Sequence, residues 1–361
     1  MNPTKQLHEV GQRLWLDNIS RELLVRGTLQ RYINDYSITG LTSNPTIFDL
    51  AIRNSGFYDD SIRQKIAHGK SGEQLFFELA LEDLTQAADL FRAIHDSTNG
   101  LDGWVSLEVS PLLAYDTQST IKEVGQLHAQ SKRPNIFIKI PGTPEGVPAI
   151  EESTFEGVPV NVTLLFSREQ YVASAEAYIR GIERRIAAGR DPRIRSVASV
   201  FVSRWDKAVM GKVPAPLQNR LGIAIAKRTY KTYRELLNSA RWQKLAQAGA
   251  LPQRLLWGST GTKDPAAPDT MYVEALAAPD TIDTIPEKTL LAFADHGRVK
   301  DVMPIDGGDA EVVLKEFAQA GVNDADVAAE LQREGAEAFS KSWNDLLKCI
   351  ASKSEMLKKV S

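Results

Sequence analysis

Residues 134–143 read PNIFIKIPGT, in which a lysine interrupts an apolar run just ahead of Pro-Gly. Side chains alternate between the two faces of a strand, so the three isoleucines share one face while Phe137 and Lys139 share the other. Burying an ammonium group without a partner is costly. Lys139 is therefore an edge-strand charge, one half of an ion pair, or a nucleophile that acts as the neutral amine.

Seven other short apolar runs resemble this one. Together they give eight strand candidates, at 13–20, 37–44, 104–111, 135–142, 159–167, 196–203, 254–261 and 271–278. Segments with helical periodicity separate them. Strands that alternate with helices eight times predict an α/β protein of the (β/α)₈ TIM barrel type.

Helix start signals support this alternation. Ser71 with Gln74, and Ser167 with Gln170, have the spacing of a capping box, in which each residue caps a backbone N–H near the other. Thr143 followed by a proline offers an N-cap and a first helical residue directly after the fourth strand.

The chain is longer than a plain barrel. Such a barrel takes about 250 residues, so roughly a hundred of the 361 residues are additional. We place them in an N-terminal helix, a double helical segment around 204–248, and C-terminal helices. No linker rich in Gly, Pro or Ser divides the chain, so we expect one elaborated barrel domain over 1–361. The barrel would occupy about 10–300, with a helical extension over 301–361.

Composition narrows the class of protein. The chain is 43% hydrophobic and 25% charged, with a net charge of -3, which argues against nucleic acid as the main partner. Cys349 is the one cysteine, so an internal disulfide is excluded, and the five histidines lack the spacing of a zinc site. No signal-peptide core and no run of about 20 apolar residues occurs, so we expect a cytoplasmic protein that does not enter membranes.

The face test on PNIFIKIPGT extends to the other strands. In a barrel the outward face packs on helices and is apolar, so the three isoleucines place Lys139 inside. The outward set of the fifth strand would be Val160, Val162 and Leu164. Five strands then send polar groups to the same interior: Asp17, Ser106, Glu108, Lys139, Asn161, Thr163 and Ser199.

A lysine in such an interior has a specific chemistry. Desolvation disfavours its charged form, so the free amine becomes accessible near neutral pH. A free amine condenses with a ketone to a Schiff base, which is an electron sink for C–C cleavage. Either Asp17 or Glu108 can act as the acid/base, and no metal or organic cofactor is needed. The alternative is that Lys139 only pairs with one of these carboxylates.

Six stretches together resemble the transaldolases, and in particular their longer bacterial subgroup. They are LWLDNISRELL (14–24), GLTSNPTIF (40–48), VSLEVSP (105–111), IFIKIPGTPEG (136–146), NVTLLFS (161–167) and SVFVSRW (199–205). The resemblance covers most of residues 10–265 in order. It implies transfer of a dihydroxyacetone unit, without a cofactor, from sedoheptulose 7-phosphate to glyceraldehyde 3-phosphate. The products would be erythrose 4-phosphate and fructose 6-phosphate, in the non-oxidative pentose phosphate pathway.

The resemblance also implies roles for the inward residues. Lys139 would form the Schiff base and Asp17 would handle the proton of the C4 hydroxyl. Glu108 and Thr163 would hold the water used to form and resolve the carbinolamine.

Substrate contacts follow from the same resemblance. Asn44 and Asn161 would hydrogen-bond substrate hydroxyls, and Ser199 would lie close to the bound dihydroxyacetone unit.

Phosphate binding is expected at the ends of the sixth and seventh strands. Arg204 matches a phosphate-binding arginine of the family, and Ser259 lies where barrels commonly bind phosphate. Shorter transaldolases carry a second arginine where this chain has Gly261, and Lys263 could supply that charge. The alternative for residues 259–262 is a plain turn.

Two other functions compete with transaldol transfer. One is a fructose 6-phosphate aldolase-type class I aldolase, which releases free dihydroxyacetone. The other is a catalytically silent barrel that binds a sugar phosphate or serves in an assembly. We expect sugar-phosphate substrates as the partners, and a monomer or weak homodimer.

Overall fold

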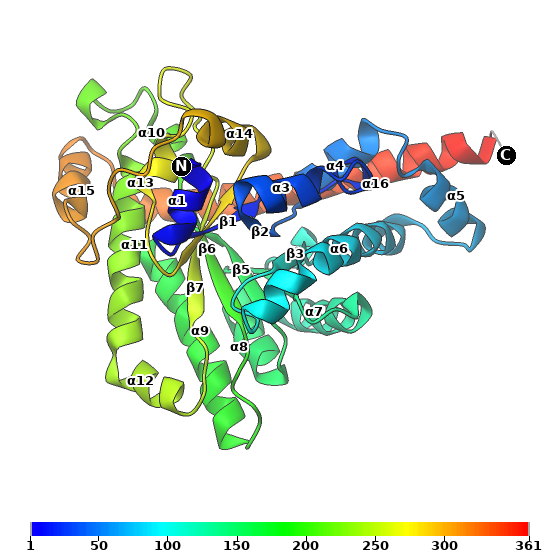
Figure 1. Ribbon diagram of the computed structural model, residues 1–361, viewed down its shortest axis with the longest axis horizontal. Helices are drawn as coiled ribbons and strands as arrows, with labels where there is room; N and C mark the ends of the chain where they lie inside the picture. Colours follow the sequence, from blue (N-terminus) through cyan, green and yellow to red (C-terminus); the bar gives the residue numbers. More distant parts are fainter. Residues whose placement is uncertain (1, 360–361) are drawn as a thin grey trace.

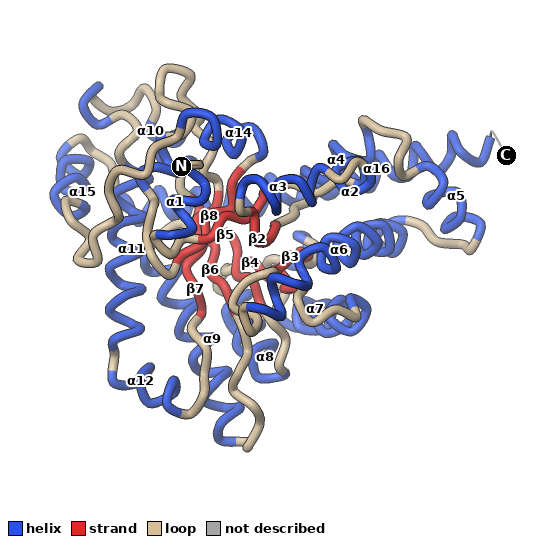
Figure 2. Tube along the Cα trace, in the orientation of Figure 1, coloured by secondary structure: helices blue, strands red, loops and turns tan. Residues whose placement is uncertain are grey.

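Eight parallel strands close into a barrel, in the order β1 to β8, in the computed structural model (Figures 1 and 2). The structure describes residues 2–359. The strands are β1 (Arg13–Leu16), β2 (Ile38–Leu41), β3 (Trp104–Glu108), β4 (Ile136–Pro141), β5 (Val160–Leu165), β6 (Ser196–Phe201), β7 (Gln253–Gly258) and β8 (Thr281–Ile285). The predicted (β/α)₈ barrel is confirmed. Residue 1 and residues 360–361 of the expected domain lie outside the described residues.

Helices surround the barrel and extend from it (Figure 2). Those before β5 are α1 (Pro3–Glu9), α2 (Arg21–Val25), α3 (Thr28–Tyr36), α4 (Pro45–Arg53), α5 (Asp59–Ala67), α6 (Gly72–Ser97), α7 (Thr117–Ser131) and α8 (Gly146–Glu156). Those after it are α9 (Arg168–Ala187), α10 (Ser203–Val209), α11 (Leu221–Asn238), α12 (Ala240–Gln247), α13 (Met271–Ala275), α14 (Glu287–His296), α15 (Ala310–Gln319) and α16 (Asp324–Lys359). None of the described helices is long and apolar enough to cross a membrane.

The predicted eighth strand, 271–278, is wrong. Residues 271–275 form α13, and the strand that closes the barrel is β8, with the sequence TIDTI. In the segment 271–278, the buried Tyr272, Val273 and Leu276 lie at helical spacing. The strand at 281–285 has only two apolar residues and so gives no apolar run in the sequence. Its threonines and isoleucines are nevertheless β-branched and favour a strand.

The helix start signals have mixed outcomes. The capping box of Ser167 and Gln170 is confirmed, with both reciprocal hydrogen bonds present. The box at Ser71 is wrong, because its side chain makes no capping hydrogen bond. Helix α8 begins at Gly146, later than predicted, although the hydroxyl of Thr143 does accept the Gly146 N–H at 3.0 Å.

The barrel interior has an apolar floor beneath its polar residues. The floor consists of Trp15, Trp104, Phe137, Val197, Leu256 and Ile282. The rings of Trp104 and Phe137 stack with centroids 4.1 Å apart. The inward polar residues lie further along the same strands, toward their C-terminal ends. Water is thereby excluded from below, and the chemistry is confined to the carboxyl end of the barrel.

The outward face follows the prediction with one exception. The three isoleucines of β4 belong to the main apolar core between barrel and helices. Leu164 was expected there too, but it packs in a second cluster with Phe166 and Phe201. The pairing of β5 with β6 shifts register between Val162 and Leu165, and Leu164 has φ of 58°. This irregularity moves Leu165 into the outer core and turns Leu164 toward α16.

Helix α16 is the longest element and reaches from the barrel to the far end of the molecule (Figure 1). It packs on α4, α5 and α6 along the way, and on the end of β5 near its beginning. Four of its residues, at spacings of three and four, are buried: Phe339, Trp343, Leu346 and Ile350. The C-terminal helical region therefore contributes to the mouth of the barrel.

Gly40 of β2 offers a test of the barrel packing. A Cβ atom there would lie 2.6 Å from the Trp104 carbonyl oxygen and 2.7 Å from the Trp15 indole nitrogen. We expect Gly40→Ala to lower the free energy of unfolding by about 1–3 kcal/mol, because neither neighbour can retreat from the packed floor. Chemical denaturation measures this change.

The matched control is Gly125→Ala, at an exposed position of α7 where a Cβ would meet nothing within 4 Å. It should stabilise the chain by about 0.5–1 kcal/mol, since alanine favours a helix over glycine. Similar effects of the two substitutions would contradict the packing argument.

Candidate active site

Lys139 lies inside the barrel, on β4, with only 5% of its surface exposed. Its Nζ donates hydrogen bonds to Glu108 Oε2 and to the Ser43 carbonyl, each at 3.2 Å. Glu108 stands beside it on β3, and Asn161 stands beside it on β5 in the strand register. The face argument from the sequence therefore predicted the direction of Lys139 correctly.

Glu108 and Thr163 each have a buried oxygen that lacks a hydrogen-bond partner within residues 2–359. These atoms are Glu108 Oε1 and Thr163 Oγ1. Burial raises the pKa of the Glu108 carboxyl, while the charge of Lys139 opposes that rise. Buried polar atoms are normally paired, so each of these two oxygens keeps the capacity for a further hydrogen bond.

Asp17 follows β1 and lines a cavity. The Thr42 hydroxyl donates to Asp17 Oδ1 at 2.9 Å, and Thr42 in turn lies 2.6 Å from the Thr284 hydroxyl. Desolvation raises the pKa of Asp17, and the charge of Lys139 is the strongest influence that lowers it. A carboxyl with a raised pKa is better suited to accept and return a proton near neutral pH.

Three inward side chains form one hydrogen-bonded row. Ser199 Oγ donates to Asn161 Oδ1 at 2.7 Å, and Asn161 Nδ2 donates to Ser106 Oγ at 3.0 Å. Asn161 is fully buried. The two hydrogen bonds fix the orientation of the Asn161 amide, so that it is already oriented when a substrate hydroxyl binds.

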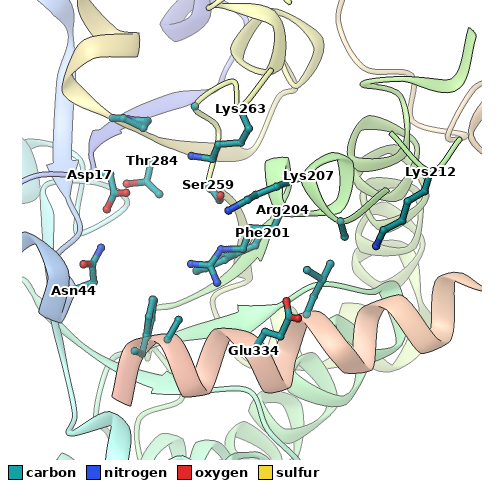
Figure 3. Close-up of a pocket in the computed structure, with 16 residues that line it drawn as sticks. Asp17, Asn44, Phe201, Arg204, Lys207, Lys212, Ser259, Lys263, Thr284 and Glu334 are labelled. Atoms are coloured by element: carbon teal, nitrogen blue, oxygen red, sulfur yellow. The ribbon is translucent and has the colours of Figure 1, made fainter. Parts of the chain in front are cut away.

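A cavity of about 750 Å³ is lined by Asp17 and by residues beyond the buried groups described so far (Figure 3). Asp17 and Asn44 line one side of it, and α16 contributes Glu334 and Phe339 to another. Asn44 is the N-cap of α4, where its Oδ1 accepts the Ile47 N–H at 3.1 Å. Its amide nitrogen is thus the part that can donate to a substrate hydroxyl.

Positive charges gather at the opposite side of the same cavity. Arg204 and Lys263 point into it (Figure 3), and burial lowers the pKa of Arg204. Partial burial also lowers the pKa of Lys263, and Arg204 and Lys207 lower it further. Neighbouring cations that are partly desolvated form a site suited to an anion such as phosphate.

The turn after β7 completes this positive side. Ser259 lies in the left-handed backbone region, with φ of 54°, and its hydroxyl is 2.9 Å from that of Ser203. A Cβ added at Gly261 would come 3.9 Å from Lys263 Nζ. The Lys263 ammonium thus lies beside residue 261, the position at which the resemblance places an arginine in the shorter transaldolases.

The sequence did not single out every residue of the cavity. Lys207 is exposed, yet it lines the cavity together with Lys212 (Figure 3). The signal was available for Lys207, because it follows Arg204 by three residues on a helix. No such signal exists for Phe339, which comes from the other end of the chain.

Within residues 2–359, no three His, Cys, Asp or Glu side chains are grouped in a way that could hold a metal ion. The ionisable side chains at the centre of the barrel are a lysine and two carboxylates, an arrangement suited to Schiff-base chemistry. Fold and site together define a class I aldolase-type (β/α)₈ barrel.

Comparison with known proteins gives the family. The sequence model of the Transaldolase/Fructose-6-phosphate aldolase family matches residues 14–350. The "Transaldolase" of Parafrankia sp. (strain EAN1pec) is 43% identical over 96% of this chain and 97% of its own length. The "Transaldolase" of Thermobifida fusca (strain YX) is 44% identical over 97% and 98%, and the "Transaldolase 2" of Nostoc punctiforme is 39% identical over 99% of both. The chain belongs to the transaldolase/fructose-6-phosphate aldolase family.

Asp283 provides a pH test of the barrel wall behind the cavity. It is fully buried on β8, on the face opposite Thr284, and accepts the Thr260 hydroxyl at 2.8 Å. Desolvation raises its pKa to about 7 from 3.8. The folded chain therefore holds this proton more tightly than the unfolded chain between about pH 4 and pH 7. Its contribution to the free energy of unfolding is greatest at low pH and falls as pH rises through that range.

We expect the free energy of unfolding of Asp283→Asn, measured relative to that of the parent chain, to rise by about 2–3 kcal/mol from pH 5 to pH 8. The reason is that the amide does not ionise, whereas the buried carboxyl does. Urea denaturation at both pH values measures the difference. Asp326→Asn, at an exposed position of α16, is the control and should leave the pH dependence unchanged. Parallel curves for the parent chain and Asp283→Asn would contradict the assignment.

Proposed function

We propose that the chain is a transaldolase that moves a dihydroxyacetone unit on a Schiff base of Lys139. The donor is sedoheptulose 7-phosphate and the acceptor is glyceraldehyde 3-phosphate, so the products are erythrose 4-phosphate and fructose 6-phosphate. The observation that carries the proposal is the buried pair of Lys139 Nζ and Glu108 Oε2, at 3.2 Å, beneath a cavity with a cationic side. Near full-length similarity to proteins named transaldolase supports it.

The first step forms the Schiff base. Glu108 takes a proton from the Lys139 ammonium, and the neutral amine attacks the C2 carbonyl of the donor. The oxygen of the adduct takes one proton from the attacking nitrogen to give the carbinolamine. A water between Glu108 Oε1 and Thr163 Oγ1 relays the proton held by Glu108 to that hydroxyl, which leaves as water as the C=N bond forms. The two unpaired buried oxygens support this role.

The second step breaks the C3–C4 bond. Asp17 removes the proton of the C4 hydroxyl, the aldose leaves as an aldehyde, and the bonding electrons enter the iminium to give an enamine. The raised pKa of Asp17 supports its role as this base. Asn44, Asn161 and Ser199 hold the hydroxyls of the dihydroxyacetone unit meanwhile.

The third step reverses the second with a new aldehyde. The enamine carbon attacks the acceptor carbonyl, Asp17 returns its proton to the new alkoxide, and water at Glu108 hydrolyses the iminium. Arg204, Ser259 and Lys263 bind the phosphate of donor and acceptor in turn. Lys207 adds positive charge at the same side of the cavity. No step uses a metal or an organic cofactor.

The remaining expectations stand beside this proposal. The chain would act as one domain over 1–361, as a monomer or weak homodimer, in the cytoplasm. A fructose 6-phosphate aldolase-type reaction remains the second candidate, because the matching family model includes both activities in its name.

Trapping tests the nucleophile and the reaction together. Borohydride reduction in the presence of fructose 6-phosphate should leave a dihydroxyacetone-derived adduct on Lys139, identified by mass spectrometry. Turnover of fructose 6-phosphate should be slow alone and fast with added erythrose 4-phosphate. Lys139→Ala should lower turnover by at least about 10³-fold with the fold intact by circular dichroism.

Lys315→Ala, at an exposed lysine of α15, is the control and should retain parent activity. An adduct on another lysine would refute the assigned nucleophile. Rapid turnover without an acceptor would favour the aldolase instead.

Lys263→Gln tests the phosphate site. We expect the KM for fructose 6-phosphate to rise about tenfold, because a charge-assisted hydrogen bond to phosphate is lost. The kcat/KM for unphosphorylated fructose should stay near the parent value. Lys300→Gln, on an exposed loop, is the matched control and should change neither constant. Equal losses with both sugars would contradict a phosphate role for Lys263.

A further inference from the structure

Phe339 of α16 lies directly against the reacting centre. Its ring centroid is 5.8 Å from Lys139 Nζ and also 5.8 Å from the Arg204 guanidinium carbon. The ring lines the cavity and is only 6% exposed. The ring therefore lies near both the nucleophile and the guanidinium on the cationic side of the cavity.

Contacts on both sides of Phe339 hold α16 in this position. Seven residues earlier, Gln332 Nε2 donates to the carbonyls of Gly142 and Leu164 at 2.9 and 3.0 Å. Four residues later, the Trp343 indole donates to Glu73 Oε1 at 2.9 Å.

Gly335 permits the close approach between these anchors. A Cβ at this glycine would lie 2.9 Å from Leu164 Cδ2 and 3.3 Å from Arg204 Nη1. Gln332, Gly335, Phe339 and Trp343 lie on one face of α16, at intervals of three and four residues. The position of the ring is therefore determined by contacts of the helix and not by its own packing alone.

We propose that Phe339 shields the Lys139 Schiff base from water and so sets how much of the bound dihydroxyacetone unit is transferred and how much is released free. This inference rests on the proposed function. An aromatic face attracts a cation, and the iminium keeps its charge on the nitrogen that lies nearest the ring. The apolar ring also occupies space from which water would attack.

The two fates of the enamine compete. In transfer, its carbon forms a bond to the acceptor aldehyde. In release, the same carbon takes a proton, which regenerates the iminium, and water then adds to C2. The C–N bond breaks with its electron pair on nitrogen, and free dihydroxyacetone and the Lys139 amine result. Only the second fate requires water at C2 before an acceptor has arrived.

The experiment measures the ratio of free dihydroxyacetone to transferred unit, with fructose 6-phosphate as donor and erythrose 4-phosphate as acceptor. Phe339→Leu should raise this ratio about fivefold, the factor expected for the loss of one cation–π contact. The borohydride adduct should remain on Lys139. Phe317→Leu is the matched control, because Phe317 of α15 is buried in the same apolar cluster without lining the cavity. It should lower stability and leave the ratio unchanged.

Gln332→Met is the second variant, and it tests the same proposal if Phe339→Leu does not fold. It keeps the ring but removes the donor that anchors α16, and the ratio should rise in the same direction. A ratio within twofold of the parent in the folded variants, with normal transfer, overturns this proposal alone. Failure of the parent chain to form the Lys139 adduct or to transfer overturns the proposed function, and this proposal with it.

Discussion

The buried contact between Lys139 and Glu108 is the constraint around which the rest of the structure is arranged. Both side chains are almost fully buried, and taking two charges out of water costs more than their attraction usually returns. The surrounding structure must therefore stabilise the pair. The Ser43 carbonyl accepts a hydrogen bond from the lysine, and the apolar floor lies on the same strands, toward their N-terminal ends. A buried pair that gains little stability, and in which Glu108 Oε1 has no partner within residues 2–359, is best explained by its chemistry.

On the side of the cavity the same pair is covered by α16, which comes from the C-terminal end of the sequence. Phe339 and Lys139 are two hundred positions apart, yet the ring lies over the ammonium. The β5 irregularity makes this possible, because it presents Leu164 and its carbonyl to the helix. The irregular backbone of β5 at Leu164 and the placement of α16 therefore depend on each other.

How far the sequence could predict this structure depended on pattern strength. The three isoleucines of β4 predicted the direction of Lys139 because one face had to meet the helices. The TIDTI strand has no continuous apolar outward face, because Asp283 lies there, and its carboxylate accepts the Thr260 hydroxyl. The irregularity at Leu164 and the position of the Phe339 ring over Lys139 depend on tertiary contacts between distant segments. No local period encodes such contacts.

Charge balance explains how the cavity can be cationic in a chain with a net charge of -3. Within residues 2–359, neither Arg204 nor Lys263 lies within ion-pair distance of a carboxylate. Burial lowers the pKa of both side chains. These two cations are held in an environment that disfavours their charge, so an anion that enters gains more than it would at the surface. Because Arg204 also lies against the Phe339 ring, a bound phosphate and the ring act on the same guanidinium. The guanidinium proposed to bind phosphate is thus also in contact with the ring that lies over Lys139, so the proposed phosphate site and the proposed nucleophile share one neighbour.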